Sequence, residues 1–291
     1  MIWAIVSKDE MENYKIPPIF KYYREVVGKD KIRLAIVEDN DELNFVDKDI
    51  DIVLLRSANE NLVNSIKDKK LISTAEDFSV YKTVSDKKVV GLLFKENGIN
   101  TPKQFKIEEI EDGREYFVKP RFGSESFGIT KDCLCSTKEE VYKQVKRIEQ
   151  ECNQEALIEE FIGGIDCTVA CVWNTNKELE TYAIKVENDE IGGIQTHEGK
   201  FNYDEYCSAL TGQEKDDICE LSKKIIKLLG VKHHARIDFR MTEKGEFYVV
   251  DVNLLPGLGP TAHFAKCMLL DGEKSYKTAI WTIVKSALVG N

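Results

Sequence analysis

Pairs of cysteines separated by two residues are missing from this sequence, although eight cysteines are scattered through its 291 residues. Zinc ribbons and thioredoxin-type redox sites need such pairs, so neither is expected. Cys133 and Cys135 have no second pair to complete a metal or redox site. Because a chain of this length can build its core without disulfides, we expect reduced thiols and a cytoplasmic location.

Long apolar runs and an excess of positive charge are also missing. The apolar start, residues 1–6, is too short for a signal sequence or a membrane span. The formal net charge of −10 disfavours nucleic acids and anionic membranes as partners. A local basic groove for a phosphate-bearing small molecule remains compatible with this charge. We therefore expect neither a nucleic acid nor a membrane as a partner.

Two glycine motifs that bind nucleotides are absent as well. No GxGxxG follows a predicted strand, and no GxxxxGK[ST] is present. What is present is an ordinary globular composition, 42% apolar and 32% charged, with enough residues for two or three lobes. Short apolar runs at 2–6, 32–37 and 52–55, with helices around 19–27 and 59–67, predict a small parallel α/β lobe at residues 1–78.

The most informative stretch, residues 235–257, contains two alternating runs around Lys244-Gly245. A two-residue turn at this dipeptide would place Asp238 opposite Asp251, and Arg236 opposite Asn253. Side chains on a strand repeat every two residues, so all four would project from one face.

Two opposed carboxylates repel each other unless a positive group lies between them. Asp238, Asp251 and Asn253 offer only hard oxygen ligands, which suit Mg²⁺. The alternative is a solvated polar face on which Arg236 neutralises the pair. Phe247 and Val249 would share this face, which favours a magnesium site over a plainly exposed surface.

A second candidate site is a glycine-rich hairpin. A strand at 116–118 leads through Lys119 into this loop, and another strand at 127–130 is expected to leave it. The loop contains four small residues, Gly123, Ser124, Ser126 and Gly128. Such a backbone can approach a ligand closely and offer N–H and hydroxyl donors to phosphate. An ordinary turn is the alternative, and the nearby Lys119 favours phosphate binding.

Acidic residues surround Gly163-Gly164, which is expected to join two strands. Glu159, Glu160 and Asp166 lie here, and surface carboxylates of a hairpin are the simplest interpretation of each. Residues 187–212 show little periodicity, and loops longer than about 15 residues are usually lids or disordered. Their apolar and aromatic residues favour a lid, which would carry Lys200.

Amphipathic patterns predict helices at 137–151, 213–229 and 276–288, the first with a capping box. Another apolar stripe predicts a helix after Asp86, with Lys87 near its start. Lys87 could simply be solvated, and this segment alone does not select it as functional.

Taken together, these segments resemble the ATP-grasp superfamily, and within it the D-alanine–D-alanine ligase-like enzymes. The resemblance covers roughly residues 80–270. Its motifs are Asp86-Lys87, Lys119-Pro120 with Gly123–Gly128, Glu159–Gly163 with Asp166, Lys200, Ala-Arg-Ile-Asp-Phe, Asp-Val-Asn and Leu-Pro-Gly. The combination of Ala-Arg-Ile-Asp-Phe with a following DxNxxPG is its most specific part.

The resemblance implies an α/β (α+β) fold in which two antiparallel sheets clamp ATP. It implies a central lobe at 79–157 and a C-terminal lobe at 158–291. ATP phosphates would contact Lys87, Lys119, Lys200 and the loop with Gly123, Ser124, Ser126 and Gly128. Adenine would lie against Glu159, Glu160, Phe161 and Ile162, and the ribose against Asp166. Two Mg²⁺ ions, with Mn²⁺ as an alternative, would bind Asp238, Asp251 and Asn253.

The implied activity is an ATP-dependent carboxylate–amine ligase that forms an amide through an acyl phosphate and releases ADP and phosphate. Arg236 and Lys200 would be catalytic. Substrate would contact Arg236, Arg56, Ser57, His197, Gly257, Thr261 and His263. Small-molecule carboxylates and amines would be the partners, and a homodimer remains open.

The sequence departs from the D-alanine ligase pattern near the expected substrates. The serine that follows Pro-Gly in those enzymes is replaced by Ala262, and a metal-ligand Glu by Asp251. Different amino-acid or peptide substrates are therefore an alternative to D-alanine. A kinase on the same scaffold and a non-catalytic nucleotide-binding protein are the other two hypotheses.

Overall fold

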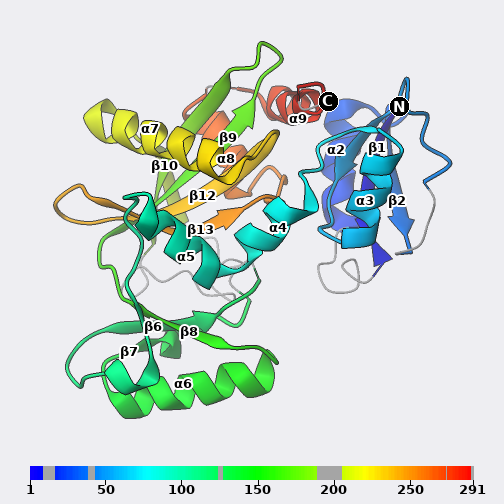
Figure 1. Cartoon of the computed structure of the whole chain (residues 1–291). Helices are drawn as coiled ribbons and strands as arrows, with labels where there is room; N and C mark the ends of the chain where they lie inside the picture. Colours follow the sequence, from blue (N-terminus) through cyan, green and yellow to red (C-terminus); the bar gives the residue numbers. More distant parts are fainter. Residues whose placement is uncertain (9–16, 39–42, 124–126, 189–204, 273, 290–291) are drawn as a thin grey trace.

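The computed structural model describes the chain except residues 9–16, 39–42, 124–126, 189–204, 273 and 290–291. The first sheet is parallel, with strand order β2-β1-β3-β4 (Figure 1, blue). Its elements are β1 (Ile2–Ser7), α2 (Pro17–Val27), β2 (Ile32–Val37), β3 (Ile52–Leu55), α3 (Glu60–Asp68) and β4 (Ile72–Ser73). The parallel α/β arrangement predicted for this part of the chain is confirmed.

A small antiparallel sheet forms the lobe drawn at the bottom of Figure 1, with order β5-β8-β6-β7. Its elements are β5 (Gln104–Phe105), η1 (Ile107–Glu109), β6 (Tyr116–Pro120), η2 (Lys131–Cys133), β7 (Leu134–Cys135), α6 (Lys138–Glu151) and β8 (Ala156–Glu160). α6 begins with the predicted capping box, in which Thr137 and Glu140 bond reciprocally. Val141 and Ile148 on α6 are buried against this sheet.

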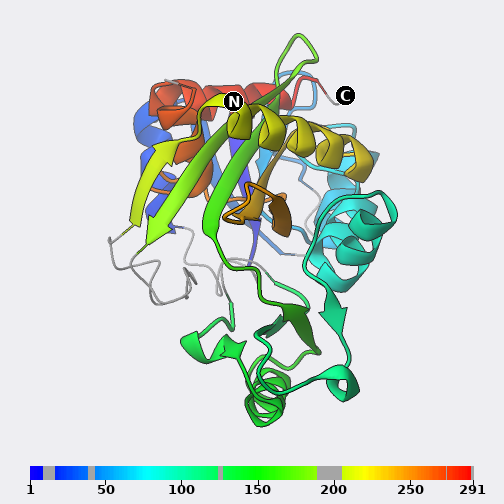
Figure 2. The ribbon, with the colours of Figure 1, turned by 90° about the vertical axis from the view of Figure 1, so that its left-hand side faces the viewer.

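The third sheet, called the large sheet below, has five antiparallel strands in the order β11-β10-β9-β12-β13. They are β9 (Ile165–Trp173), β10 (Leu179–Asn188), β11 (Glu205–Ala209), β12 (His234–Met241) and β13 (Phe247–Asn253). Helices cover both faces of this sheet, each with its own core cluster. α7 (Gly212–Leu229) packs on one face, and α8 (His263–Leu270) with α9 (Tyr276–Ser286) packs on the other. Figure 2 shows α7 crossing these strands, with the small sheet below them.

The packing of α4 (Phe78–Ser85) and α5 (Lys87–Glu96) and the position of β8 bear on where the lobes begin and end. Both helices share a core cluster with the large sheet, through Val84, Val90 and Phe94. The predicted boundary between residues 157 and 158 falls inside β8, which pairs with β6 along its length. The division into three lobes remains a prediction.

The β12–β13 hairpin has the predicted pairs near the site but a different turn. Arg236 pairs with Asn253 and Asp238 with Asp251, as predicted. The predicted two-residue turn is wrong. The N–H of Thr242 donates to the carbonyl of Glu246, and the N–H of Gly245 donates to the carbonyl of Thr242, which closes a three-residue turn at 243–245. A bulge after Asp238 adds one residue to β13 and restores the predicted pairs.

The bulge also corrects the predicted arrangement of side chains on β13. Phe247 and Val249 pack in the core cluster beneath the large sheet, together with Val252. They therefore do not share the face of Asp251, which lines a pocket instead. The extra residue in the bulge reverses the alternation, so the apolar neighbours cited in favour of a magnesium site lie on the other side.

Three further predicted elements differ from the structure. Residues 127–130 are not a strand, because Gly128 has a φ of +71° and a 3₁₀ turn precedes β7. The strands on either side of Gly163-Gly164 are not a hairpin, because β8 and β9 belong to different sheets. The predicted loop at 187–212 contains β11, which pairs with β10, and its residues 189–204 lie outside the described part.

None of the described helices combines the length and the apolar character that crossing a bilayer requires.

Candidate functional site

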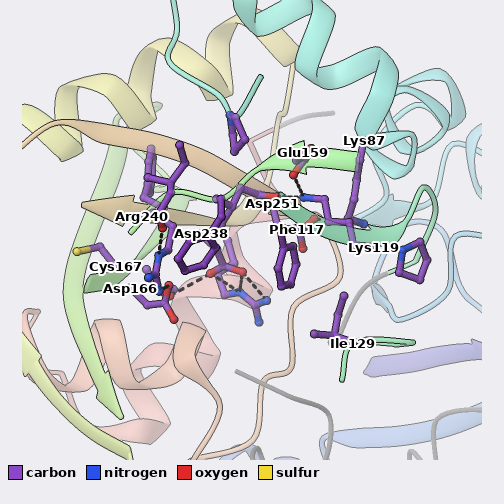
Figure 3. Close-up of a pocket in the computed structure, with 18 of the residues that line it drawn as sticks. Lys87, Phe117, Lys119, Ile129, Glu159, Asp166, Cys167, Asp238, Arg240 and Asp251 are labelled. Carbon is purple, nitrogen blue, oxygen red and sulfur yellow. Dashed lines mark hydrogen bonds and ion pairs between the residues drawn. The ribbon is translucent and has the colours of Figure 1, made fainter. Parts of the chain in front are cut away.

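A pocket lies where the small sheet faces the large one, and Figure 3 shows 18 of the residues that line it. It brings together twelve of the predicted site residues: Lys87, Lys119, Gly123, Glu159, Glu160, Phe161, Ile162, Asp166, Arg236, Asp238, Asp251 and His263. Four other candidates lie outside the described residues: Ser124, Ser126, His197 and Lys200. Gly128, Asn253, Gly257, Thr261, Arg56 and Ser57 are described but are not among the lining residues.

Two lysines enter the pocket beside carboxylates. The Lys119 ammonium lies 2.6 Å from Glu159 and donates to the carbonyl of Val250 at 3.2 Å. Lys87 donates to the carbonyl of Gly123, and its ammonium lies 3.5 Å from Asp251. Both lysines therefore bring positive charge to the gap between the sheets, as phosphate binding requires.

The backbone at Lys87 is held by the residue before it. Asp86 caps α5 by accepting the N–H of Lys88 and Val89, and Arg121 donates to both of its oxygens at 2.6–2.8 Å. The bonds from Arg121 hold the pKa of Asp86 below its usual value. This ion pair joins the start of α5 to the end of β6, and so joins the segments that carry the two lysines.

In the glycine-rich segment, steric crowding explains why one position is glycine. Gly128 adopts a φ of +71°, and a Cβ there would lie 2.7 Å from Pro120 Cγ. Its carbonyl accepts a bond from Arg147 of α6 at 2.8 Å. Gly128 thus packs the loop onto the small sheet, whereas Gly123, with a φ of +103°, lies at the pocket.

Asp166 is paired with an arginine that the sequence analysis missed. Arg240 donates to Asp166 at 2.8 Å and to the carbonyl of Ile162 at 3.0 Å, and its guanidinium lies 5.8 Å from the Phe161 ring centroid (Figure 3). Burial raises the pKa of Asp166, and Arg240 opposes this shift. The alternation of residues 236, 238 and 240 on one strand was the signal that could have identified Arg240.

The three candidate metal ligands lie on neighbouring strands. Arg236 donates to both oxygens of Asp238 at 2.8–3.1 Å, and Thr168 donates to Asp238 at 3.0 Å. Although burial opposes it, Arg236 holds the pKa of Asp238 below its usual value. Asn253 is buried, its Oδ1 accepts the N–H of Leu255, and its Nδ2 has no partner among the described residues. Arg236 thus neutralises Asp238, as the alternative of a solvated polar face predicted. The face itself lines a pocket, however, and is not an open surface.

The remaining candidates lie around the end of the large sheet. His263, the first residue of α8, is 2.9 Å from Glu205 of β11 and lines the pocket. Arg56 donates to the carbonyls of Leu255 and Pro256 at 3.2 and 2.7 Å, which attaches the N-terminal lobe to the segment before Gly257. Ser57 is fully buried and bonds Ser7. A substrate role for Arg56, Ser57, Gly257 and Thr261 remains a prediction.

Known sequences resemble more than half of this chain. A family model described as D-ala D-ala ligase C-terminus matches residues 91–285, about two thirds of the chain. D-alanine–D-alanine ligase of Francisella philomiragia is 30% identical over 155 residues, which are 53% of this chain and 50% of that protein. The same enzyme of Francisella tularensis subsp. novicida is 27% identical over the same shares. The chain spans about half the length of these curated relatives.

Solved structures with the same fold cover most of the chain. D-alanine–D-alanine ligase of Bacillus anthracis complexed with ATP superposes with a TM-score of 0.75, covers 99% of this chain and 97% of that one, and is 18% identical. VanG D-Ala:D-Ser ligase of Enterococcus faecalis has a TM-score of 0.65 at 18% identity, over 87% and 74% of the two chains. The sequence match and the two facing sheets lead to one conclusion: the chain has the ATP-grasp fold and belongs to the D-alanine–D-alanine ligase C-terminal family.

Proposed function

We propose that this protein is an ATP-dependent ligase that joins a carboxylate to an amine through an acyl phosphate. The observation that carries the proposal is the pocket between the two antiparallel sheets. It combines Lys87 and Lys119 with Arg236 and with the opposed carboxylates Asp238 and Asp251. Cations beside carboxylates suit a nucleoside triphosphate and the metal ions that accompany it, because the cations bind phosphate and the carboxylates bind metal.

The nucleotide would lie along the length of the pocket. Lys87 and Lys119 would contact phosphates, and each would then exchange a carboxylate partner for phosphate oxygen. Glu159, Glu160, Phe161 and Ile162 would line the adenine, with Asp166 beside the ribose. Gly123, Ser124, Ser126 and Gly128 would cover the phosphates, and Lys200 would reach the γ-phosphate.

Two Mg²⁺ ions, or Mn²⁺ in their place, would be held by Asp238, Asp251 and Asn253. The donor set fits these metals because it contains only carboxylate and amide oxygens. Asp238 and Asp251 face each other across the ladder, where a cation would offset their repulsion. When bound, the ions would neutralise phosphate charge during phosphoryl transfer.

The chemistry follows from the poor reactivity of a free carboxylate toward an amine. Phosphorylation turns its oxygen into a good leaving group, after which the amine attacks the carbonyl carbon. The attack places negative charge on the carbonyl oxygen, and Arg236, fixed by three hydrogen bonds to Asp238, would stabilise that charge.

Amino acids are the proposed substrates, because the relatives are named for D-alanine and D-serine. D-alanine is one candidate, and Ala262, which replaces the expected serine, makes a different second amino acid the other. The partners would be these small carboxylates and amines rather than nucleic acid or membrane. We also propose a cytoplasmic location and a homodimer.

The test is release of phosphate and ADP with Mg²⁺-ATP across all pairs of D- and L-amino acids, followed by mass spectrometry. A dipeptide from one pair would support the ligase and identify its substrates. A stable phosphorylated product without an amine would point to a kinase. ATP binding without turnover for any pair would point to a nucleotide-binding protein, and AMP with pyrophosphate would contradict the acyl-phosphate route.

A further inference from the structure

One residue of the pocket wall, His263, is paired with a carboxylate behind it, and this pair has no role in the chemistry described above. His263 Nε2 lies 2.9 Å from Glu205 Oε2, and the two side chains are 13% and 15% exposed. Lys266, one turn along α8, lies 3.5 Å from the same carboxylate. Burial raises the pKa of Glu205, but His263 and Lys266 outweigh it and hold that pKa below its usual value. The pair is therefore an imidazole beside an ionised carboxylate.

This contact determines which ring nitrogen of His263 can accept a proton. An ionised carboxylate only accepts hydrogen bonds, so the imidazole donates its Nε2–H to Glu205. In a neutral ring the lone pair then lies on Nδ1. Within the described part of the chain, Nδ1 of His263 bonds to no other group. Glu205 thus holds the ring in the tautomer that can act as a base.

The location of the ring suits the second half of the proposed reaction. His263 lines the same pocket as Arg236 and Asp238, and a positive charge on its ring, once it is protonated, acts to lower the pKa of Asp166 and of Asp238. Arg236 is the residue proposed to face the carbonyl oxygen under attack. An amine that approaches this carbonyl arrives as an ammonium ion near neutral pH and cannot attack until it loses a proton.

We propose that His263 is the general base that deprotonates the acceptor amine and that Glu205 is its positioning residue. Nδ1 takes one proton from the ammonium group, and the freed lone pair forms the C–N bond at the acyl-phosphate carbon. The C–O bond to phosphate then breaks, and the second nitrogen proton leaves with the departing phosphate. The imidazolium, stabilised by Glu205, returns its proton to solvent. This inference rests on the proposed ligase function.

The test compares two acceptors in the same enzyme. Hydroxylamine is largely neutral at pH 7 and attacks acyl phosphates without a base, whereas an amino acid arrives protonated. With Mg²⁺-ATP and each D- or L-amino acid in turn as the donor, mass spectrometry measures the hydroxamate and, with the amino-acid pair that the ligase joins, the dipeptide. The variant His263→Asn should lower dipeptide formation about 10²-fold or more and change hydroxamate formation by less than about 3-fold. Its dipeptide defect should shrink as the pH is raised, because the free amine becomes more abundant.

Two further variants separate a base from other roles. Glu205→Gln should reduce dipeptide formation about 10-fold and spare the hydroxamate, as expected for a residue that acts through His263. Cys207→Ser is the matched control, since its sulfur belongs to the same cluster but has no part in proton transfer, and both products should be unchanged.

Three results would overturn the inference. Equal loss of both products in His263→Asn would make this residue a binding or structural group. Loss of the dipeptide in Cys207→Ser as severe as in His263→Asn would indicate that the cluster acts as one unit, such as a metal site. Failure of the unmodified protein to form a hydroxamate with any of the D- and L-amino acids would contradict the ligase proposal itself, and this outcome is distinguishable because it precedes any mutation.

Discussion

Each cationic side chain in the pocket lies beside a carboxylate. Lys119 contacts Glu159, Arg236 contacts Asp238, and Arg240 contacts Asp166. Such pairs balance positive against negative charge in a partly buried site, where an isolated charge would cost several kcal/mol. In the complex with nucleotide and metal, phosphate could take the place of the carboxylate beside each cation, and metal the place of the cation beside each carboxylate. Removing one member of a pair therefore tests which of these ligands the other member binds.

Asp251→Asn tests the metal assignment, because it removes one of the two opposed carboxylates without changing the shape of the side chain. We expect turnover to need a roughly 10–100-fold higher Mg²⁺ concentration. The measurement is initial rate against Mg²⁺ at saturating ATP. Glu243→Gln, in the exposed turn of the same hairpin, is the control and should keep the original Mg²⁺ dependence. An unchanged dependence in Asp251→Asn would remove this residue from the metal site.

Arg236→Ala and Arg240→Ala form a matched pair on one strand. Arg236 is proposed to act on developing charge, so its loss should lower kcat by about 10²-fold with a smaller effect on KM for ATP. Arg240 holds Asp166 and the Ile162 carbonyl, so its loss should raise KM for ATP about 10-fold and affect kcat less. Steady-state kinetics with varied ATP distinguishes them, and a reversal of the two patterns would exchange their roles.

Among the elements, the β12–β13 hairpin shows how a bulge determines the direction of side chains. The bulge after Asp238 places Phe247 and Val249 in the core and Asp251 at the pocket. A regular ladder would put all three on one face. The connection between β8 and β9 depends on a similar local feature, since Gly164 has a φ of +132° where the chain passes between sheets.

Gly164→Ala should be strongly destabilising, whereas Gly163→Ala should not. A Cβ at Gly164 would lie 2.0 Å from the carbonyl oxygen of Met241, and backbone cannot move aside as a flexible side chain can. No atom of the described part of the chain lies within 4 Å of a Cβ at Gly163. We expect a loss of about 3 kcal/mol at Gly164 and of less than about 1 kcal/mol at Gly163, measured by urea denaturation. Equal losses would contradict the crowding described here.

At the scale of the whole molecule, buried polar contacts attach the N-terminal lobe to the large sheet. Glu76, which follows β4, accepts the backbone N–H groups of Lys232 and His233 at 2.9–3.0 Å, directly before β12. Arg56, which follows β3, bonds the carbonyls of residues 255 and 256. Both contacts flank the strands that carry the candidate metal ligands, so the lobes and the site are mechanically connected.

Glu76 predicts how stability depends on pH. Burial raises the pKa of Glu76 from 4.5 to about 7, partly offset by the backbone N–H groups and Lys232. Between these values the folded chain binds more protons than the unfolded chain, so the free energy of unfolding falls as pH rises from about 4.5 to 7. This group alone would contribute roughly 3 kcal/mol to the fall.

Glu76→Gln cannot ionise and should lack this part of the pH dependence. The measurement is the urea midpoint of both proteins at pH 5 and at pH 8, where the loss on raising the pH should be smaller in the variant. Glu25→Gln, an exposed carboxyl on α2, should retain the original slope. Parallel slopes in all three proteins would contradict a protonated Glu76 in the fold.

Local sequence patterns determined much of this protein. Alternation of two residues placed Arg236 and Asp238 on one face of β12 and Asp251 and Asn253 on one face of β13, and Thr137 with Glu140 identified the start of α6. The order of the motifs was sufficient to predict the ATP-grasp fold. These features depend on contacts between residues close in the chain, or on periodicity, which a sequence displays directly.

Only the tertiary structure decided features that depend on distant partners. β8 and β9 are adjacent in sequence but pair with strands of different sheets, a choice that local pattern does not encode. His263 meets Glu205 across 58 positions, and Arg240 meets Asp166 across 74. The turn at 243–245 and the bulge after Asp238 compensate each other, because packing of the apolar face determines the register while the turn and bulge adjust to it.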